Sequence, residues 1–140
     1  MYMRGDELTS FLQICYDTLK KWIRDGFLAV DDRAEPDPGP LGHPLFAYPS
    51  IEAFLRTSYP APEDAPSLVE LMVLSKLVEM PPLLTRKQAS AALGISVRSL
   101  GIVLAQTKTE LRFIRLVPDG TIRIFVSDFV EYAAKREARS

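Results

Sequence analysis

One short pattern occurs twice in this chain, 81 residues apart, and it constrains the fold more than any other feature. The first copy, LQICYDTL, runs from Leu12 to Leu19, and the second, LGISVRSL, runs from Leu93 to Leu100. Each copy has apolar residues on both sides of a bend, a small residue at the start of a helix, and a leucine one turn later. These are the packing requirements of two short helices joined by a tight turn. The sequence therefore predicts two bihelical corners.

The residues around each corner predict the same order of elements: helix, turn, helix, β-hairpin, helix. In the first half, Asp6 is the expected N-cap of a helix to Leu12. A helix over 15–25, strands at 27–30 and 45–48 around a Pro-rich loop (31–44), and a helix from about 49 follow.

In the second half, Thr85 and Ser96 are the expected N-caps of helices at 86–93 and from 96 to about 106. Alternating apolar residues over 111–126, on either side of a Pro-Asp-Gly turn, predict a hairpin. Ser127 or Asp128 is expected to cap a closing helix.

A linker and one very apolar helix separate the two halves. Residues 60–66 are proline-rich and acidic, and Ser67 with Glu70 has the spacing of a capping box. The helix that follows, Ser67–Met80, is apolar around most of its surface, which suits either a core helix or a dimer interface. The expected fold class is therefore α+β, mainly helical, with a first unit at 1–59, a linker and connecting helix at 60–82, and a second unit at 83–140.

The charge is distributed unevenly along the chain. Residues 1–66 carry six Lys/Arg and eleven Asp/Glu, a net charge of −5, whereas residues 81–140 carry ten Lys/Arg and five Asp/Glu, a net charge of +5. This asymmetry favours different partners for the two halves, or a contact between them. The basic second half is the better candidate for a nucleic-acid partner.

Several classes of function are not supported by the residues. There is one cysteine and one histidine, so no disulfide, metal site or cofactor is expected. No glycine-rich phosphate loop or Ser/His pair indicates an enzyme. No apolar run reaches the roughly 18 residues of a membrane span, and no secretory leader is visible. A cytoplasmic protein is the natural expectation.

Both halves resemble a known family. The stretch LLTRKQASAALGISVRSL resembles the opening of the winged helix-turn-helix of phage excisionases and MerR-like regulators. ELTSFLQICYDTLKKWIRDGFL is similar to the same family at other points, including Trp22 and the helix-ending Gly26. The resemblance covers about 4–57 and 83–134, and it implies two divergent tandem winged helix-turn-helix units.

The resemblance also implies which residues meet double-stranded DNA, because in this family the second helix enters the major groove and the wing touches the backbone. On the second helices these are Tyr16, Lys20, Lys21 and Arg24, and then Arg98 and Ser99. On the second wing they are Arg112, Arg115 and Arg123. For the charged residues, ordinary solvation of a charged face is the alternative, and for Ser99 it is local capping of the helix.

This chain also departs from the family. Gln13 and Cys15 replace the turn glycine and the N-cap serine, and GIVLAQ replaces the segment with the tryptophan. The three successive apolar residues of that segment, from Ile102, predict a largely buried helix. The function expected is transcriptional regulation by binding double-stranded DNA as a homodimer, with Ser67–Met80 as the candidate dimer interface. An excisionase-like architectural role is a variant of the same function. The alternative is a protein-interaction adaptor such as a corepressor, antirepressor or assembly factor.

Overall fold

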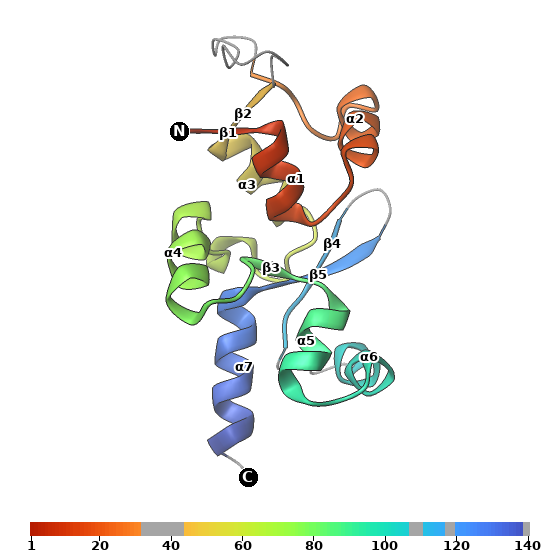
Figure 1. Ribbon diagram of the computed structural model, residues 1–140, viewed down its shortest axis with the longest axis vertical. Coiled ribbons are helices and arrows are strands. Elements are labelled where there is room, and N and C mark those ends of the chain that lie inside the picture. Colours follow the sequence, from red (N-terminus) through yellow and green to blue (C-terminus); the bar gives the residue numbers. More distant parts are fainter. Residues whose placement is uncertain (32–43, 107–110, 117–119, 139–140) are drawn as a thin grey trace. The chain divides into compact units, whose positions relative to one another are not determined.

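The computed structural model describes residues 1–31, 44–106, 111–116 and 120–138, which form a mixed α+β structure that is mostly helical (Figure 1). The chain divides into two compact units, Met1–Thr57 and Ser58–Ser140. The first unit therefore ends at Thr57, two residues before the end expected at residue 59. The apolar helix expected between the units belongs to the second unit.

The first unit contains three helices and a two-stranded sheet. Strand β1 (Tyr2–Arg4) pairs antiparallel with β2 (Leu45–Ala47). Helices α1 (Gly5–Leu12), α2 (Tyr16–Arg24) and α3 (Tyr48–Arg56) enclose the core. The core contains fully buried side chains from every helix and from β2: Leu8, Leu12, Leu19, Trp22, Phe46 and Ile51. The rings of Trp22 and Phe54 lie with their centroids 5.4 Å apart.

The strand predicted at 27–30 is wrong. The N–H groups of Gly26 and Phe27 donate to the carbonyls of Ile23 (3.2 Å) and Trp22 (2.9 Å), which closes α2 in a Schellman motif. Gly26 has a φ of +85°, the left-handed conformation that this motif requires. The strand β2 pairs instead with β1, so the expected first hairpin is replaced by pairing with the beginning of the chain. Nearly all of the Pro-rich loop, 32–43, lies outside the described residues.

The second unit is built on a three-stranded antiparallel sheet. Its order is β3 (Leu83–Leu84), β5 (Thr121–Phe125), β4 (Ile114–Leu116), so β5 is the central strand. The hairpin predicted over 111–126 is confirmed in its two strands, while Pro118 and Asp119 of its turn lie outside the described residues. Helices α5 (Arg86–Leu93) and α6 (Val97–Ala105) precede the hairpin.

Three of the predicted N-caps are confirmed. The side chains of Ser67, Thr85 and Ser96 each accept a hydrogen bond from the backbone N–H three residues later, over 3.0–3.1 Å. At α5 the capping box is complete, because the Gln88 side chain accepts the N–H of Thr85 at 2.9 Å. These caps satisfy N–H groups that the first turn of a helix leaves unpaired.

The other predicted caps are wrong. Helix α1 begins at Gly5, so Asp6 lies inside its first turn. Helix α7 (Val126–Ala138) begins directly after β5, where the Val126 N–H donates to the Pro82 carbonyl at 2.9 Å. Because a neighbouring strand segment satisfies this N–H, Ser127 and Asp128 are not needed as caps and lie within the helix.

The apolar helix α4 (Leu68–Val78) lies beside α7, as Figure 1 shows in green and blue. Leu68 and Leu71 are buried. On another side of α4, Val69, Val73 and Leu77 are 47%, 53% and 76% exposed, at a spacing of four residues. One side of this helix is therefore core, and another presents an apolar stripe. In the part of the chain that the structure describes, no single helix is long and apolar enough to cross a membrane.

Candidate nucleic-acid interface

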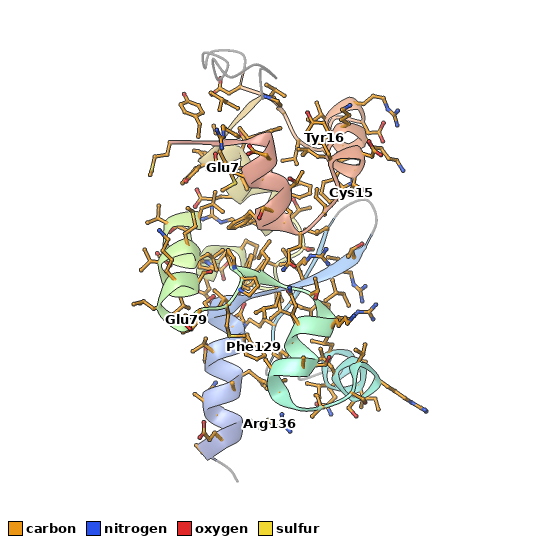
Figure 2. All side chains as sticks on the ribbon, viewed as in Figure 1. Glu7, Cys15, Tyr16, Glu79, Phe129 and Arg136 are labelled. Atoms are coloured by element: carbon orange, nitrogen blue, oxygen red, sulfur yellow. The ribbon has the colours of Figure 1, made fainter. Side chains whose placement is uncertain are left out.

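The second bihelical corner is formed by α5, a three-residue turn and α6. The two helices are bent by 104° relative to each other. Gly94 takes the left-handed conformation in the turn, with a φ of +70°, and Ser96 caps α6. Arg136, labelled in Figure 2, reaches from α7 and donates to the carbonyl of Leu93 at 3.1 Å, at the C-terminal end of α5. The turn between the helices is thus held by the Ser96 cap on the α6 side and by Arg136 on the α5 side.

A pocket of about 520 Å³ lies where this corner meets the β4–β5 hairpin. It is lined from the start of α5, the first residue of α6, strand β4 and the first half of β5. The lining residues are Thr85, Arg86, Lys87, Val97, Arg115, Gly120, Thr121, Ile122 and Arg123. Four of these described residues are cationic and none is acidic. We call this the cationic pocket.

Two of the four cations lie in the first turn of α5. The N-terminal end of a helix carries partial positive charge, so Arg86 and Lys87 are in an electrostatically unfavourable position there. The capping box satisfies the N–H groups of Thr85 and Gln88. The N–H groups of Arg86 and Lys87 have no partner within the helix. This end of α5 therefore attracts an anion through both its backbone and its side chains.

Arg123 brings a third charge from the central strand, and its side chain is buried. The residue is 7% exposed, and its guanidinium donates to the Ile122 carbonyl at 2.9 Å. Burial lowers the pKa of Arg123 below its usual value, because the charged form loses hydration. The predicted role of Arg123 on a solvent-exposed wing face therefore does not match its burial. It instead lines the cationic pocket.

Arg115 provides the fourth charge, and its position is fixed by the backbone. The Ser58 hydroxyl accepts the Arg115 N–H at 2.8 Å and donates to the Arg115 carbonyl at 2.9 Å. The Arg115 guanidinium donates to the Gly120 carbonyl at 3.4 Å and lies 5.5 Å from the centroid of the Phe113 ring. These contacts orient an exposed arginine toward the pocket in advance of any ligand.

The remaining predicted residues of the second unit lie outside this pocket. Arg98 is exposed on the first turn of α6, next to Val97 of the lining. Ser99 is used locally, because its N–H and its hydroxyl both meet the Ser96 hydroxyl at 3.0 Å. Arg112 lies beside Tyr59, and a hydrogen bond between the Arg112 side chain and the Tyr59 hydroxyl raises the pKa of Arg112. Tyr59 in turn donates to the Asp128 carboxylate at 3.0 Å.

The predicted residues of the first unit gather on α2, but their charge is partly compensated. Figure 2 shows Cys15 and Tyr16 at the start of this helix. The ammonium of Lys20 lies 5.1 Å from the centroid of the Tyr16 ring, and Arg24 forms an ion pair with Asp25 at 3.4 Å. Lys21 is exposed. The face is mixed rather than uniformly cationic.

Arg86 and Lys87 were not among the predicted site residues. The signal for them is present in the sequence, since two basic residues directly follow the N-cap Thr85, where acidic residues are favourable. Local conflicts of this kind are expected at functional sites.

No protein-family model matches the chain, and comparison with curated proteins and with solved structures finds no match either.

Proposed function

We propose that this protein is a cytoplasmic DNA-binding transcriptional regulator whose second unit binds double-stranded DNA in the manner of a winged helix-turn-helix. The observation that carries the proposal is the cationic pocket, in which four cations from α5, β4 and β5 converge and none of the described lining residues is acidic. Contacts to the phosphate backbone supply essentially all of the non-specific affinity of a protein for DNA, and they require such cations.

The arrangement of elements supports the same function. A bend of 104° lies within the range of a helix-turn-helix, and a hairpin follows the second helix of the corner. In this proposal α6 presents Arg98 to base edges in the major groove, where an arginine pairs with guanine. Arg86, Lys87 and Arg115 contact the backbone phosphates on either side.

The first unit has a weaker case for direct contact with DNA. Its candidate residues Tyr16, Lys20 and Arg24 already contact one another or Asp25. We propose that α2 adds backbone contacts, and that the second unit provides the main binding surface.

The experiment that tests this function measures the affinity for a random-sequence duplex by fluorescence anisotropy at two salt concentrations. The logarithm of the binding constant is expected to fall with the logarithm of salt, by about 0.9 for each phosphate neutralised. The double variant Arg86→Glu, Arg115→Glu is expected to lower affinity by at least about tenfold and to flatten this slope.

The matched control is Lys76→Glu with Lys135→Glu, which changes the net charge equally on α4 and α7, away from the pocket. Affinity within about threefold of wild type is expected for the control. An equal loss in both double variants would show that only net charge matters. Lys20→Glu with Arg24→Glu then tests the first unit, and unchanged affinity would remove α2 from the interface.

One observation favours a second candidate function, that of a protein-interaction adaptor. The apolar stripe of Val69, Val73 and Leu77 is exposed on α4. Such a stripe suits a protein contact, and we propose that in the regulator it joins two copies of the chain. Binding to DNA weakens steeply with salt, whereas an apolar protein contact does not, so salt dependence separates the two functions.

A further inference from the structure

A second hollow adjoins the cationic pocket and differs from it in character. Its volume is about 230 Å³, and it shares Arg86, Arg115 and Ile122 with the cationic pocket. The rest of its lining is apolar and comes from α6 and the residue before β4: Gly101, Leu104, Ala105 and Phe113. We call it the apolar hollow. Two arginines thus stand at the boundary between an anion-attracting space and an apolar one.

Gly101 lines the apolar hollow without a side chain to occupy it. It lies in the interior of α6, where glycine destabilises a helix relative to alanine. A Cβ atom built on Gly101 would meet nothing within 4 Å, and the residue does not have a positive φ. A side chain would therefore fit without a backbone clash, and because Gly101 lines the hollow we expect that side chain to occupy part of it.

Phe113 gives the hollow one flat wall. The Arg115 guanidinium lies 5.5 Å from the centroid of this ring, so the aromatic face and the cation are already adjacent. A ligand with an aromatic ring next to an anionic group would place the ring against Phe113 and Gly101 and the anion beside Arg115. Three guanidinium groups and one ammonium suit phosphate, because an arginine can donate two parallel hydrogen bonds to it.

We propose that the cationic pocket and the apolar hollow together form a binding site for a small aromatic phosphate monoester. The phosphate lies among Arg86, Lys87, Arg115 and Arg123, and the ring occupies the apolar hollow. The cationic pocket is of the size that small-molecule sites have, about 300–1,000 Å³. This site goes beyond binding to DNA, since a backbone phosphate uses the shared arginines but has no ring to place beside Gly101.

The test compares phenyl phosphate with inorganic phosphate by isothermal titration calorimetry on the full chain. Phenyl phosphate is expected to bind at least about tenfold more tightly, because the ring loses contact with water in the apolar hollow. Gly101→Leu is expected to remove this difference and to leave the affinity for inorganic phosphate unchanged. Gly101→Ala is the matched control, since it changes helix propensity in the same direction but fills little of the hollow.

A third measurement separates this site from the proposed function. Duplex DNA affinity is expected to be the same in wild type and in Gly101→Leu, because Gly101 and the other apolar residues of the hollow are assigned no DNA contact; only Arg86 and Arg115 are. Equal affinity for the two phosphates in wild type, or no binding of either, would overturn the site. A Gly101→Leu variant that loses duplex affinity but keeps the preference for phenyl phosphate would overturn it as well, and would assign the hollow to DNA.

Discussion

The Ser96 hydroxyl donates a hydrogen bond to the Ser99 hydroxyl over 3.0 Å at the start of α6. The equivalent pair at the start of α2 is Cys15 and Thr18, whose Sγ and Oγ1 atoms also lie 3.0 Å apart. The same relationship therefore occurs at both bihelical corners, 81 positions apart in sequence. The two corners differ in their N-caps. The Ser96 side chain also accepts a backbone N–H of α6, whereas the Cys15 side chain makes no such hydrogen bond to α2.

This difference predicts how the first corner can be stabilised. Gln13 has a φ of +56°, a conformation that Gly94 adopts at no steric cost in the second corner. The double variant Gln13→Gly, Cys15→Ser gives the first corner the residues of the second. Its free energy of unfolding is expected to rise by about 1–2 kcal/mol. Urea denaturation followed by Trp22 fluorescence measures it, because Trp22 lies in the first unit. Ser96→Ala is the converse control; followed by circular dichroism, it is expected to destabilise the second unit by about 1 kcal/mol.

The caps and the second hairpin could be predicted because they depend on local chemistry. Thr85 and Ser96 have the side-chain oxygen that an N-cap needs, and the apolar alternation around residues 114–125 is a property of two strands with one buried face. The first hairpin could not be predicted, because β2 pairs with β1 from the other end of the unit. The composition of residues 27–30 does not reveal that β1, and not this segment, pairs with β2.

The site was predicted only in part, for a related reason. Arg115 and Arg123 were expected on one wing, but burial of Arg123 depends on which face of β5 packs inward. Arg86 and Lys87 meet them only through the tertiary fold. The prediction that Ile102 lies in a largely buried helix is wrong, since this residue is 60% exposed. Three successive apolar residues cover too much of a helix's circumference for all of them to face one core.

Asp128 predicts a pH-dependent contribution to stability in the second unit. Burial raises the pKa of its carboxyl above the ordinary value of 3.8, although the hydrogen bond from Tyr59 opposes the shift. A carboxyl with a raised pKa in the folded state favours folding most when protonated, and this contribution is lost as pH rises through that pKa. Asp128→Asn does not titrate. The stability of wild type relative to this variant is therefore expected to fall as pH increases from about 3 to 7.

Chemical denaturation of both proteins across this pH range checks the prediction. Tyr59→Phe serves as the control, because it removes the hydroxyl that hydrogen-bonds to the carboxylate and leaves the ring beside Phe125, 5.2 Å away between centroids. Without that bond, the pKa of Asp128 is expected to rise further, and the pH-dependent region to move upward. A constant difference between wild type and Asp128→Asn at every pH would contradict the prediction.

The exposed stripe on α4 predicts the oligomeric state. If Val69, Val73 and Leu77 join two copies of the chain, wild type should be a dimer by light scattering, and Val73→Glu should be a monomer, because a carboxylate in an apolar contact loses hydration. Ile102→Glu introduces the same charge at another exposed apolar residue, on α6, and should leave the mass unchanged. A monomeric wild type would exclude α4 as a homodimer interface and leave the stripe to a different protein.

Arg123 predicts how the cationic pocket responds to an anion. Its buried guanidinium donates to the Ile122 carbonyl, and removing one partner of a buried polar interaction destabilises a fold. Arg123→Met is therefore expected to unfold at a lower temperature than wild type in a buffer without multivalent anions. Sulfate should raise the unfolding temperature of wild type more than that of Arg123→Met, because a ligand stabilises the folded state according to its affinity.

Differential scanning fluorimetry in sulfate, with sodium chloride at the same ionic strength as the reference, distinguishes binding from general screening. Lys135→Met, which removes a charge that is paired with Glu131 on α7, is the control and should respond to sulfate as wild type does. If Arg123→Met is strongly destabilised and equally responsive to sulfate, then Arg123 serves the packing of β5, and the anion is held by the exposed cations Arg86, Lys87 and Arg115 alone. An unchanged fold with a weaker response would instead identify Arg123 as a residue kept charged for the sake of its ligand.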